Sequence, residues 1–266
     1  VSPGLKLNWA GVEGLEETLG RNGVTSNYRY DLAPYTWHLV QEMKEGRALF
    51  TQPPMPIKCA GAPQKAMYLS GDAWFRRGVL KDVDIQFMNA GGVLFGVKEY
   101  VPALMEYVKK YDADLNFFHT LTSVDGAAKK ATFKVAKPDT DPTEITVDFD
   151  MMHVCPPQVA PDFIRVSPLA DAAGWVDVDQ ATLRHKNYDN VWSLGDVMNA
   201  PNAKTMAAAR KQAPVVAENI VADIKGGSPV AQYDGYGSCP LTVERGKIVL
   251  AEFGYGGALK PSFPSF

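Results

Sequence analysis

The chain has 266 residues, 46% of them hydrophobic, which is enough to fill the core of one large domain or two modest ones. It carries 27 basic and 30 acidic residues and no run of five Lys or Arg, which argues against a nucleic-acid-binding surface. No apolar run approaches the roughly 18 residues that indicate a transmembrane helix, and no signal peptide opens the chain.

The three cysteines, Cys59, Cys155 and Cys239, are too few for a disulfide scaffold and too scattered for a zinc site, so we predict no metal. The chain opens on Val1 and stops on a proline-rich apolar stretch, residues 261–266. From these abrupt ends we expect that sequence is missing on both sides.

In chain order, residues 1–4 are predicted to form a strand that runs into a turn, and the segment up to about residue 30 is irregular. A short helix is predicted over residues 32–43. A short strand is predicted over residues 48–51, and it ends at a cluster of prolines within residues 53–56.

Residues 63–118 continue as helix, strand, helix and strand. The first helix is predicted to start near Pro63, because proline suits the first helical position. Alternation predicts a strand over residues 83–87, helical spacing predicts a helix within 97–111, and a strand follows over 113–118. The order β-α-β-α-β implies a parallel sheet covered by helices. The buried face of the first helix is predicted to consist of Ala62, Ala66, Leu69 and Ala73.

The second half of the chain is predicted to begin with an antiparallel hairpin, residues 130–135 and 144–149, and a further strand, 150–154. A long helix follows later and is expected to end at the glycines of 226–227, which are typical of a C-cap. A last strand is predicted over residues 247–253. The buried face of the long helix is predicted to consist of Met206, Ala209, Ala213, Val216, Ile220 and Ile224.

A strand is also predicted over residues 190–196, ending in Gly195 and Asp196 before the long helix. Glycine lets the backbone turn beside a ligand, the carboxylate accepts hydrogen bonds from sugar-like hydroxyls, and the helix start favours an anion. Gly-Asp turns are also common without any ligand. The apolar strand before this pair is similar to the second flavin fingerprint of flavoproteins with two dinucleotide-binding domains, which would put Lys204 and Thr205 near the flavin ring. Without that likeness, Lys204 is interpreted as an ordinary solvated lysine.

Cys59 lies in the first strand-to-helix turn of the predicted parallel sheet. A nucleotide-binding turn would read Gly-x-Gly-x-x-Gly, whereas residues 59–65 hold one glycine, which argues against NAD(P)H as the reductant. A thiol just before a helix N-terminus is favoured as the thiolate, and Lys58 and Lys65 add positive charge nearby. The alternative interpretation is a small buried cysteine with a structural role.

Cys239 ends a loop rich in glycine and aromatic residues, 233–240, ahead of the last predicted strand. A cysteine between Gly-Ser and Pro is expected on a turn or at a strand start. Taken alone, it is interpreted as structural rather than catalytic. Cys59 and Cys239 are far apart in the sequence, and their spacing does not show that the fold brings them together.

Four segments together resemble the sulfide:quinone oxidoreductases of the type found in mitochondria and many proteobacteria. The first of them surrounds Cys59 and the last surrounds Cys239, and they resemble the two active-site segments of that family. The likeness covers nearly the whole chain, and the motifs are long and uncommon. The matching segments are residues 56–70, 167–179, 195–205 and 233–240.

The resemblance implies an α/β fold with two dinucleotide-binding domains, and one FAD between a pair of redox cysteines and a quinone pocket. By this match, Cys59 and Cys239 would form a disulfide or sulfur-bridged centre that sulfide attacks, which leaves a persulfide on one cysteine and a thiolate on the other. The thiolate would reduce FAD, which would pass two electrons to ubiquinone, while the persulfide sulfur goes to an acceptor. The cofactor-binding residues implied by the match are Gly4, Gly195, Asp196, Lys204 and Thr205.

The resemblance also indicates which parts of the family this chain lacks. The N-terminal strand and Gly-x-Gly-x-x-Gly turn that bind the ADP half of FAD would precede Val1, and the C-terminal helices that dock on the membrane would follow Phe266. We therefore expect an incomplete, inactive fragment that does not retain FAD, from a peripheral enzyme of a bacterial or mitochondrial inner membrane. The predicted domains are residues 1–45 (part of the FAD-binding domain and a linker), 46–160 (a central Rossmann-like domain) and 161–266 (the C-terminal part of the FAD-binding domain).

Other interpretations stay open. Cys155 lies where no family cysteine is expected and is interpreted as structural, with a third redox thiol as the alternative; His153 is expected to be packed rather than catalytic. The alternatives within the same superfamily are a flavocytochrome-type sulfide dehydrogenase and an NADH:quinone oxidoreductase, although the two cysteine segments and the missing glycines disfavour the latter. A non-catalytic sulfur-binding or scaffold domain without flavin is the alternative of a different class. The remaining histidines have no partners at a readable spacing: His38, His119 and His185.

Overall fold

The computed structural model describes residues 1–201 and 203–263. Its strands are β1 (Lys6–Leu7), β2 (Val24–Thr25), β3 (Gly46–Gln52), β4 (Val83–Asn89), β5 (Asp114–Phe117), β6 (His119–Asp125), β7 (Lys130–Val135), β8 (Thr143–Asp148), β9 (Met151–His153), β10 (Gln158–Val159), β11 (Gly237–Glu244) and β12 (Lys247–Phe253). Its α-helices are α1 (Leu15–Thr18), α2 (Ala33–Glu42), α3 (Ala62–Arg77), α4 (Val101–Lys110), α5 (Asp162–Arg165) and α6 (Met206–Ile224). None of the helices in these two ranges is both long and apolar enough to cross a bilayer.

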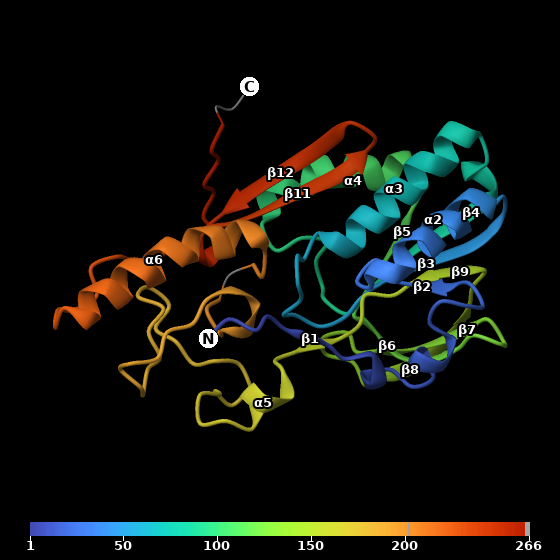
Figure 1. The fold of residues 1–266 in the computed structure, drawn as a ribbon. Helices are drawn as coiled ribbons and strands as arrows, with labels where there is room; N and C mark the ends of the chain where they lie inside the picture. Colours follow the sequence, from blue (N-terminus) through green and yellow to red (C-terminus); the bar gives the residue numbers. More distant parts are fainter. Residues whose placement is uncertain (202, 264–266) are drawn as a thin grey trace.

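The centre of the fold is a parallel sheet in the order β2-β9-β3-β4-β5 (Figure 1). Helix α3 connects β3 to β4, and α4 connects β4 to β5. The predicted β-α-β-α-β unit with a parallel sheet is therefore confirmed. The predicted hairpin is confirmed as β7 and β8, and a strand that was not predicted, β6, pairs with β7 to complete a three-stranded antiparallel sheet.

The parallel sheet is buried on both faces, as the neighbouring residues of β3 show, because they belong to different hydrophobic clusters. In β3, Ala48 and Phe50 belong to the cluster that contains α3 and α4, whereas Leu49 belongs to the cluster shared with β6 and β7. Each of these three residues has no exposed surface. The layers are therefore an antiparallel sheet, the parallel sheet and the helices.

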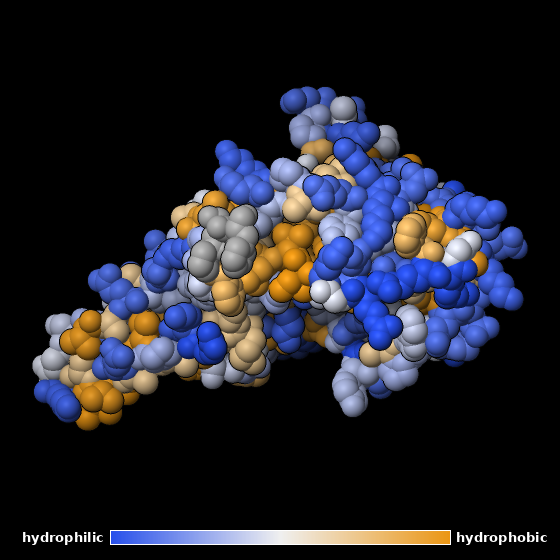
Figure 2. Space-filling view, turned by 90° about the horizontal axis from the view of Figure 1, so that it is seen from above, coloured by the Kyte–Doolittle hydropathy of each residue, from blue (hydrophilic) through white to orange (hydrophobic). Residues whose placement is uncertain are grey.

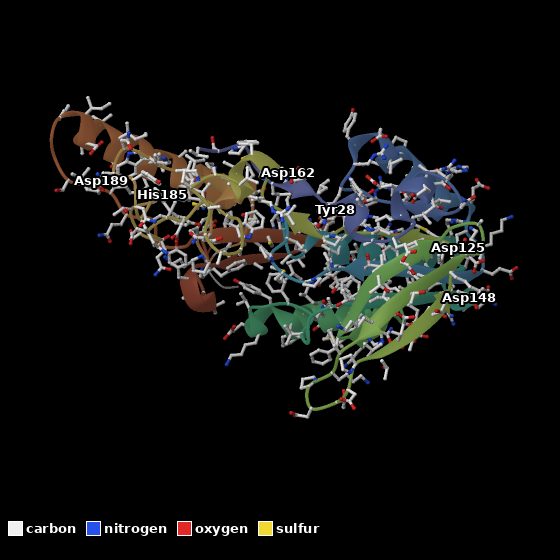
Figure 3. The ribbon with its side chains drawn as sticks, turned by 90° about the horizontal axis from the view of Figure 1, so that it is seen from below. Tyr28, Asp125, Asp148, Asp162, His185 and Asp189 are labelled. Atoms are coloured by element: carbon white, nitrogen blue, oxygen red, sulfur yellow. The ribbon has the colours of Figure 1, made fainter. Side chains whose placement is uncertain are left out.

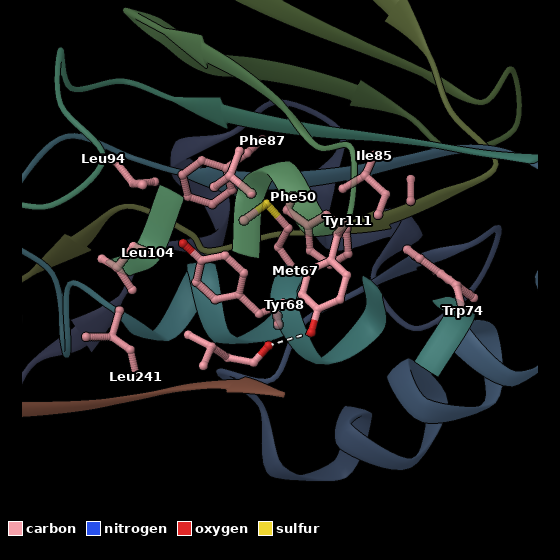
Figure 4. Packing of buried hydrophobic residues seen from close by; sticks show 14 of the residues in the cluster. Phe50, Met67, Tyr68, Trp74, Ile85, Phe87, Leu94, Leu104, Tyr111 and Leu241 are labelled. Atoms are coloured by element: carbon pink, nitrogen blue, oxygen red, sulfur yellow. Dashed lines mark hydrogen bonds between the residues drawn. The ribbon is translucent and has the colours of Figure 1, made fainter. Parts of the chain in front are cut away.

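The hairpin of β11 and β12 forms a further layer over α3 and α4 (Figure 1). Leu241 of β11 packs into the same cluster as Tyr68 of α3, and the Tyr111 hydroxyl donates to the Val243 carbonyl at 2.8 Å (Figure 4). Because α3 is enclosed by the sheet on one side and by β11 on another, its predicted buried face is wrong in part. Leu69 is exposed, Ala62 and Ala73 are half-buried, and the largest buried side chains of α3 are Met67, Tyr68 and Trp74.

The residues between 160 and 233 build a second core around α6, with few regular elements. The strands predicted over residues 1–4 and 190–196 are absent from the described residues: the latter segment is extended but makes only a single bridge, Arg184 to Trp192, and ends in a 3-10 turn at Gly195–Val197. The N-terminal ammonium of Val1 donates to the Trp192 carbonyl at 2.6 Å, so these two segments run together without forming a ladder.

Helix α6 ends as predicted, with Gly226 in the left-handed conformation (φ 75°) just after its last turn. Its predicted buried face is largely wrong. The α6 residues Met206, Ala213 and Ile224 are exposed, and Figure 2 shows apolar side chains on the surface at the α6 end of the molecule. The buried face is Ala208, Gln212, Val215, Val216 and Asn219, two of which are polar.

Candidate functional site

The fold brings the two predicted cysteines together. Cys59 lies in the turn between β3 and α3, and Cys239 is the third residue of β11, in agreement with the expected turn or strand start. Their sulfur atoms are 3.8 Å apart, and both thiols are free. The contact depends on Gly61, because a Cβ at that position would lie 2.8 Å from the Leu241 side chain of β11. Glycine at the start of α3 therefore lets β11 approach closely enough for the thiols to meet.

The two thiols have opposite electrostatic surroundings. The hydrogen bond from Cys239, the ammonium of Lys65 and the N–H of Gly61 together lower the pKa of Cys59, against an opposing effect of burial. The Lys65 Nζ lies 3.6 Å from the Cys59 sulfur. The neighbouring Cys59 sulfur and burial raise the pKa of Cys239. Cys59 is therefore the thiolate of the pair, and Cys239 is the thiol that donates to it.

A cavity of about 650 Å³ opens beside Cys59. Its walls come from the N-terminal segment, the Cys59 turn, the Gly-Asp turn, the start of α6 and the start of β11. Every residue predicted to bind the cofactor lines it. Its lining includes Gly4, Lys58, Cys59, Gly195, Asp196, Lys204 and Thr205.

Two glycines face the open space of this cavity. Gly4 and Gly195 both have left-handed backbones, with φ of 78° and 80°, and a Cβ added to either would meet no atom within 4 Å. The Gly195 N–H donates to the Gln212 side chain of α6 at 2.8 Å, which ties the Gly-Asp turn to the helix. The cavity thus extends right up to the backbone at both positions.

The cavity also presents polar groups suited to a hydroxylated or anionic ligand. The Asp196 carboxylate lies 4.0 Å from the Lys58 ammonium. Thr205 caps α6, its hydroxyl accepting from the Ala208 N–H at 3.2 Å, so the positive end of a 19-residue helix dipole faces the cavity. This combination of open glycine backbones, a carboxylate and a helix N-terminus fits the sugar-like and phosphate parts of a flavin cofactor.

Lys204 is not a solvated lysine. It is 7% exposed, and its ammonium donates to the Asp196 and Met198 carbonyls at 2.7 and 2.9 Å and lies 4.1 Å from the centre of the Trp175 ring. Burial lowers its pKa to about 8, against the attraction of nearby carboxylates. Its backbone carbonyl accepts from the Cys59 N–H at 2.9 Å, which joins the cavity wall to the cysteine turn.

The other sequence candidates lie outside this arrangement. Cys155 is buried and burial raises its pKa to about 12, which disfavours a thiolate. His153 is buried, its Nε2 accepts from the Asn27 N–H at 2.9 Å, and burial lowers its pKa to about 4. The ring nitrogens of His185 contact the Leu169 carbonyl and the Asn187 N–H. Figure 3 shows His185 toward one end of the molecule, well away from Tyr28 near its middle.

Two contacts of the cysteine turn were not found from the sequence. Tyr28 donates to the Lys58 carbonyl at 3.1 Å, and the Gln158 side chain accepts from the Lys58 N–H. Neither residue lies in a periodic pattern or close to Cys59 in the sequence, so no local signal marks it. A second, mainly apolar cavity of about 390 Å³ was also not predicted, and it touches the turn through Ile57 and Ala60.

Comparison with solved structures identifies the fold. The sulfide:quinone oxidoreductase of Aquifex aeolicus superposes with a TM-score of 0.65 at 19% sequence identity, over 89% of this chain and 56% of that chain. The chain has the α/β fold, with a parallel sheet, of the flavin-dependent disulfide reductases. A scan against protein-family models finds no match.

Comparison with curated proteins gives the nearer relationship. The mitochondrial sulfide:quinone oxidoreductase of Dictyostelium discoideum is 44% identical over 267 residues, and that of Mus musculus is 41% identical over 265 residues. Each alignment covers 99% of this chain, and the chain spans about 58% of the length of each relative. The chain is therefore homologous, over its whole length, to part of the sulfide:quinone oxidoreductases.

Proposed function

We propose that this chain carries the sulfide-oxidising centre of a sulfide:quinone oxidoreductase, with Cys59 and Cys239 as its redox pair. The observation that carries the proposal is the 3.8 Å approach of the two sulfurs at the edge of the cavity beside Cys59. The names of the homologous proteins supply the substrate class, sulfide and a quinone.

The unequal surroundings of the two sulfurs support different roles for them. In the oxidised pair, HS⁻ attacks the Cys239 sulfur, the S–S bond breaks, and its electron pair leaves on Cys59 as a thiolate. Cys239 keeps the new sulfur and the proton of HS⁻ as a persulfide. Lys65 and the Gly61 N–H stabilise the departing Cys59 thiolate, and a thiol of lower pKa leaves faster. A nucleophilic acceptor then takes the outer sulfur, and Cys239 is released as a thiolate.

Restoring the disulfide removes two electrons from the two thiolates. A bound FAD would accept these electrons and pass them to a quinone. Cys59, which lines the cavity, is the sulfur that faces this acceptor, whereas Cys239 is not among the lining residues. Gly4, Gly195, Asp196 and Thr205 would hold the cofactor, and the Lys204 ammonium would keep the Gly-Asp turn in shape through its bonds to two backbone carbonyls.

The remaining assignments are proposals at the level of the whole enzyme. We assign residues 1–45 and 161–266 to the FAD-binding domain and 46–160 to the central domain, and we place the enzyme on a bacterial or mitochondrial inner membrane. The isolated chain is expected to retain little FAD, because residues 59–65 carry no Gly-x-Gly-x-x-Gly turn and no such turn occurs elsewhere in the sequence.

The decisive experiment follows the sulfur atom. The purified chain is oxidised, exposed to sulfide, and analysed by peptide mass spectrometry. We expect one added sulfur atom on the Cys239 peptide and a newly reactive thiol at Cys59. Sulfide-dependent reduction of a soluble ubiquinone analogue is then measured in the FAD-loaded full-length parent enzyme, because the isolated chain is expected to retain little FAD. Cys59→Ser and Cys239→Ser should each abolish both signals.

Cys155→Ser is the matched control, since it removes a buried thiol outside the pair but keeps an acceptor for the Gln158 amide, and it should leave both signals in place. A persulfide that forms equally on all three cysteines, or turnover that survives the loss of either member of the pair, would contradict the assignment. Thiols that neither oxidise nor react with sulfide would instead indicate a scaffold domain.

A further inference from the structure

The peptide that precedes Cys59 is held from both sides by side chains from distant parts of the chain. The Tyr28 hydroxyl donates to the Lys58 carbonyl at 3.1 Å, and the Lys58 N–H donates to the Gln158 side-chain oxygen. The next N–H, that of Cys59, donates to the Lys204 carbonyl at 2.9 Å. Three hydrogen bonds thus fix the two consecutive peptide units that precede Cys59.

Cys59 requires this support because its backbone is left-handed, with φ of 55°. A residue with a Cβ adopts that conformation at a cost of roughly 1–2 kcal/mol and keeps it only when its surroundings determine it. The left-handed turn directs the Cys59 sulfur toward Cys239. A relaxed, right-handed or extended Cys59 would point its side chain elsewhere.

The side chains of Tyr28 and Gln158, which together form a clamp on the Lys58 peptide, are themselves held in place. Gln158 belongs to β10, is 7% exposed, and its amide nitrogen lies 3.8 Å from the Cys155 sulfur. That contact orients the amide so that its oxygen faces the Lys58 N–H. Tyr28 follows a tight turn in which its own N–H donates to the Ser26 hydroxyl at 3.1 Å. Burial raises the pKa of the Tyr28 phenol, so it stays protonated and remains a donor.

We propose that Tyr28 and Gln158 are positioning residues that hold the Lys58 peptide and thereby keep the Cys59 sulfur within reach of Cys239. They touch neither sulfur of the pair. Their effect is to raise the effective concentration of one thiol at the other, which favours the oxidised form. The buried Cys155 then serves as the partner of the Gln158 amide. The inference rests on the proposed redox pair and adds the residues that tune it.

The test is the equilibrium of the pair with glutathione, in which two thiols and one oxidised glutathione give the Cys59–Cys239 disulfide and two reduced glutathiones. The purified 266-residue chain is equilibrated at a series of glutathione ratios, quenched by alkylation and read by peptide mass spectrometry. Tyr28→Phe and Gln158→Met each remove one clamp bond. Each should lower the equilibrium constant about five- to tenfold, the effect of one net hydrogen bond, and the double variant should lower it further.

Tyr255→Phe is the matched control, because it also removes a tyrosine hydroxyl that donates to a backbone carbonyl, that of Gln180 at 2.6 Å. It should leave the constant unchanged. A merely structural role for Tyr28 or Gln158 would destabilise the reduced and oxidised chains equally, so an unchanged constant in both single variants would overturn the inference. If Gln158→Met does not fold, Tyr28→Phe alone decides. A wild-type pair that never oxidises would refute the proposed function instead.

Discussion

At the scale of single residues, Lys65 adds to the effect of the Cys239 hydrogen bond in lowering the pKa of Cys59. Lys65 lies one turn into α3, and its ammonium is 3.6 Å from the Cys59 sulfur. Lys58 is the immediate neighbour of Cys59 in the sequence, yet its ammonium points to the Asp196 carboxylate, 4.0 Å away. The sequence-based interpretation treated both lysines as nearby charge, whereas the structure assigns only Lys65 to the sulfur.

We therefore predict that Lys65→Met raises the pKa of Cys59. A nearby positive charge favours the thiolate, so its removal should shift the midpoint of thiolate formation upward by about one pH unit, toward the ordinary value for cysteine. The measurement is the rate of iodoacetamide reaction at Cys59 as a function of pH in the reduced chain. At pH 7 the variant should react more slowly than the wild type.

Two variants bracket this prediction. Lys65→Arg keeps the charge and should keep most of the shift, and Lys58→Met removes a charge that is directed elsewhere and should move the midpoint much less. A Lys65→Met profile that coincides with that of the wild type would show that the Cys239 hydrogen bond alone sets the pKa.

At the scale of elements, α6 shows that a helix can be held by its polar residues. Asn219 has no exposed surface. Its amide donates to the Thr182 and Ala231 carbonyls at 3.1 and 3.0 Å, and its oxygen accepts from the Val230 and Ala231 N–H groups, both at 2.8 Å. One buried side chain thus bonds to four backbone groups and ties α6 to the segments around Thr182 and Ala231.

Asn219→Ala is expected to destabilise the chain by about 3 kcal/mol, because the four hydrogen bonds of a fully buried amide are lost at once. The free energy of unfolding in urea measures it. Glu218→Ala, one residue earlier on the exposed side of α6, is the control and should change the free energy by less than about 0.5 kcal/mol. Equal losses in the two variants would mean that the helix, rather than the Asn219 contacts, is the sensitive element.

The same helix explains how far sequence reasoning reaches. Periodicity and the Gly226 stop located α6 correctly, but its buried face was misassigned because Gln212 and Asn219 are buried for their hydrogen bonds and not for apolar area. Leu69 of α3 was misassigned because a helix enclosed by a sheet and a hairpin does not follow a single apolar stripe. Hydropathy patterns report a single apolar face, and neither helix is positioned by such a face alone.

For the site, the resemblance pointed to both cysteine segments and to five further residues that line the cavity, namely Gly4, Gly195, Asp196, Lys204 and Thr205. It did not identify Tyr28 or Gln158, whose contact with Lys58 exists only after the chain has folded. Local patterns indicate which helix or strand a residue forms. A contact between residues 28, 58 and 158 depends instead on how three distant segments of the chain are arranged after folding.

At the scale of the whole molecule, the two cysteines belong to different layers. Cys59 precedes α3 on the parallel sheet, and Cys239 lies in the hairpin that covers α3 from outside (Figure 1). A bond between them would join positions 180 apart in the sequence and would fasten the outer layer to the central one. Oxidation of the pair is therefore coupled to the stability of the entire fold, and the two must change together by thermodynamic necessity.

Oxidation should raise the free energy of unfolding by 2 to about 5 kcal/mol, since a cross-link that closes a loop of this length removes much of the entropy of the unfolded chain, and strain in the folded state reduces the gain. Urea unfolding of the oxidised and the reduced chain measures the difference. Cys155→Ser should preserve it and Cys239→Ser should abolish it. If oxidised and reduced chains unfold at the same urea concentration, the two thiols do not form a bond in the folded state. If oxidation stabilises Tyr28→Phe less than it stabilises the wild type, the hydrogen bond from Tyr28 to the Lys58 carbonyl contributes both to the redox equilibrium and to the stability gained on oxidation.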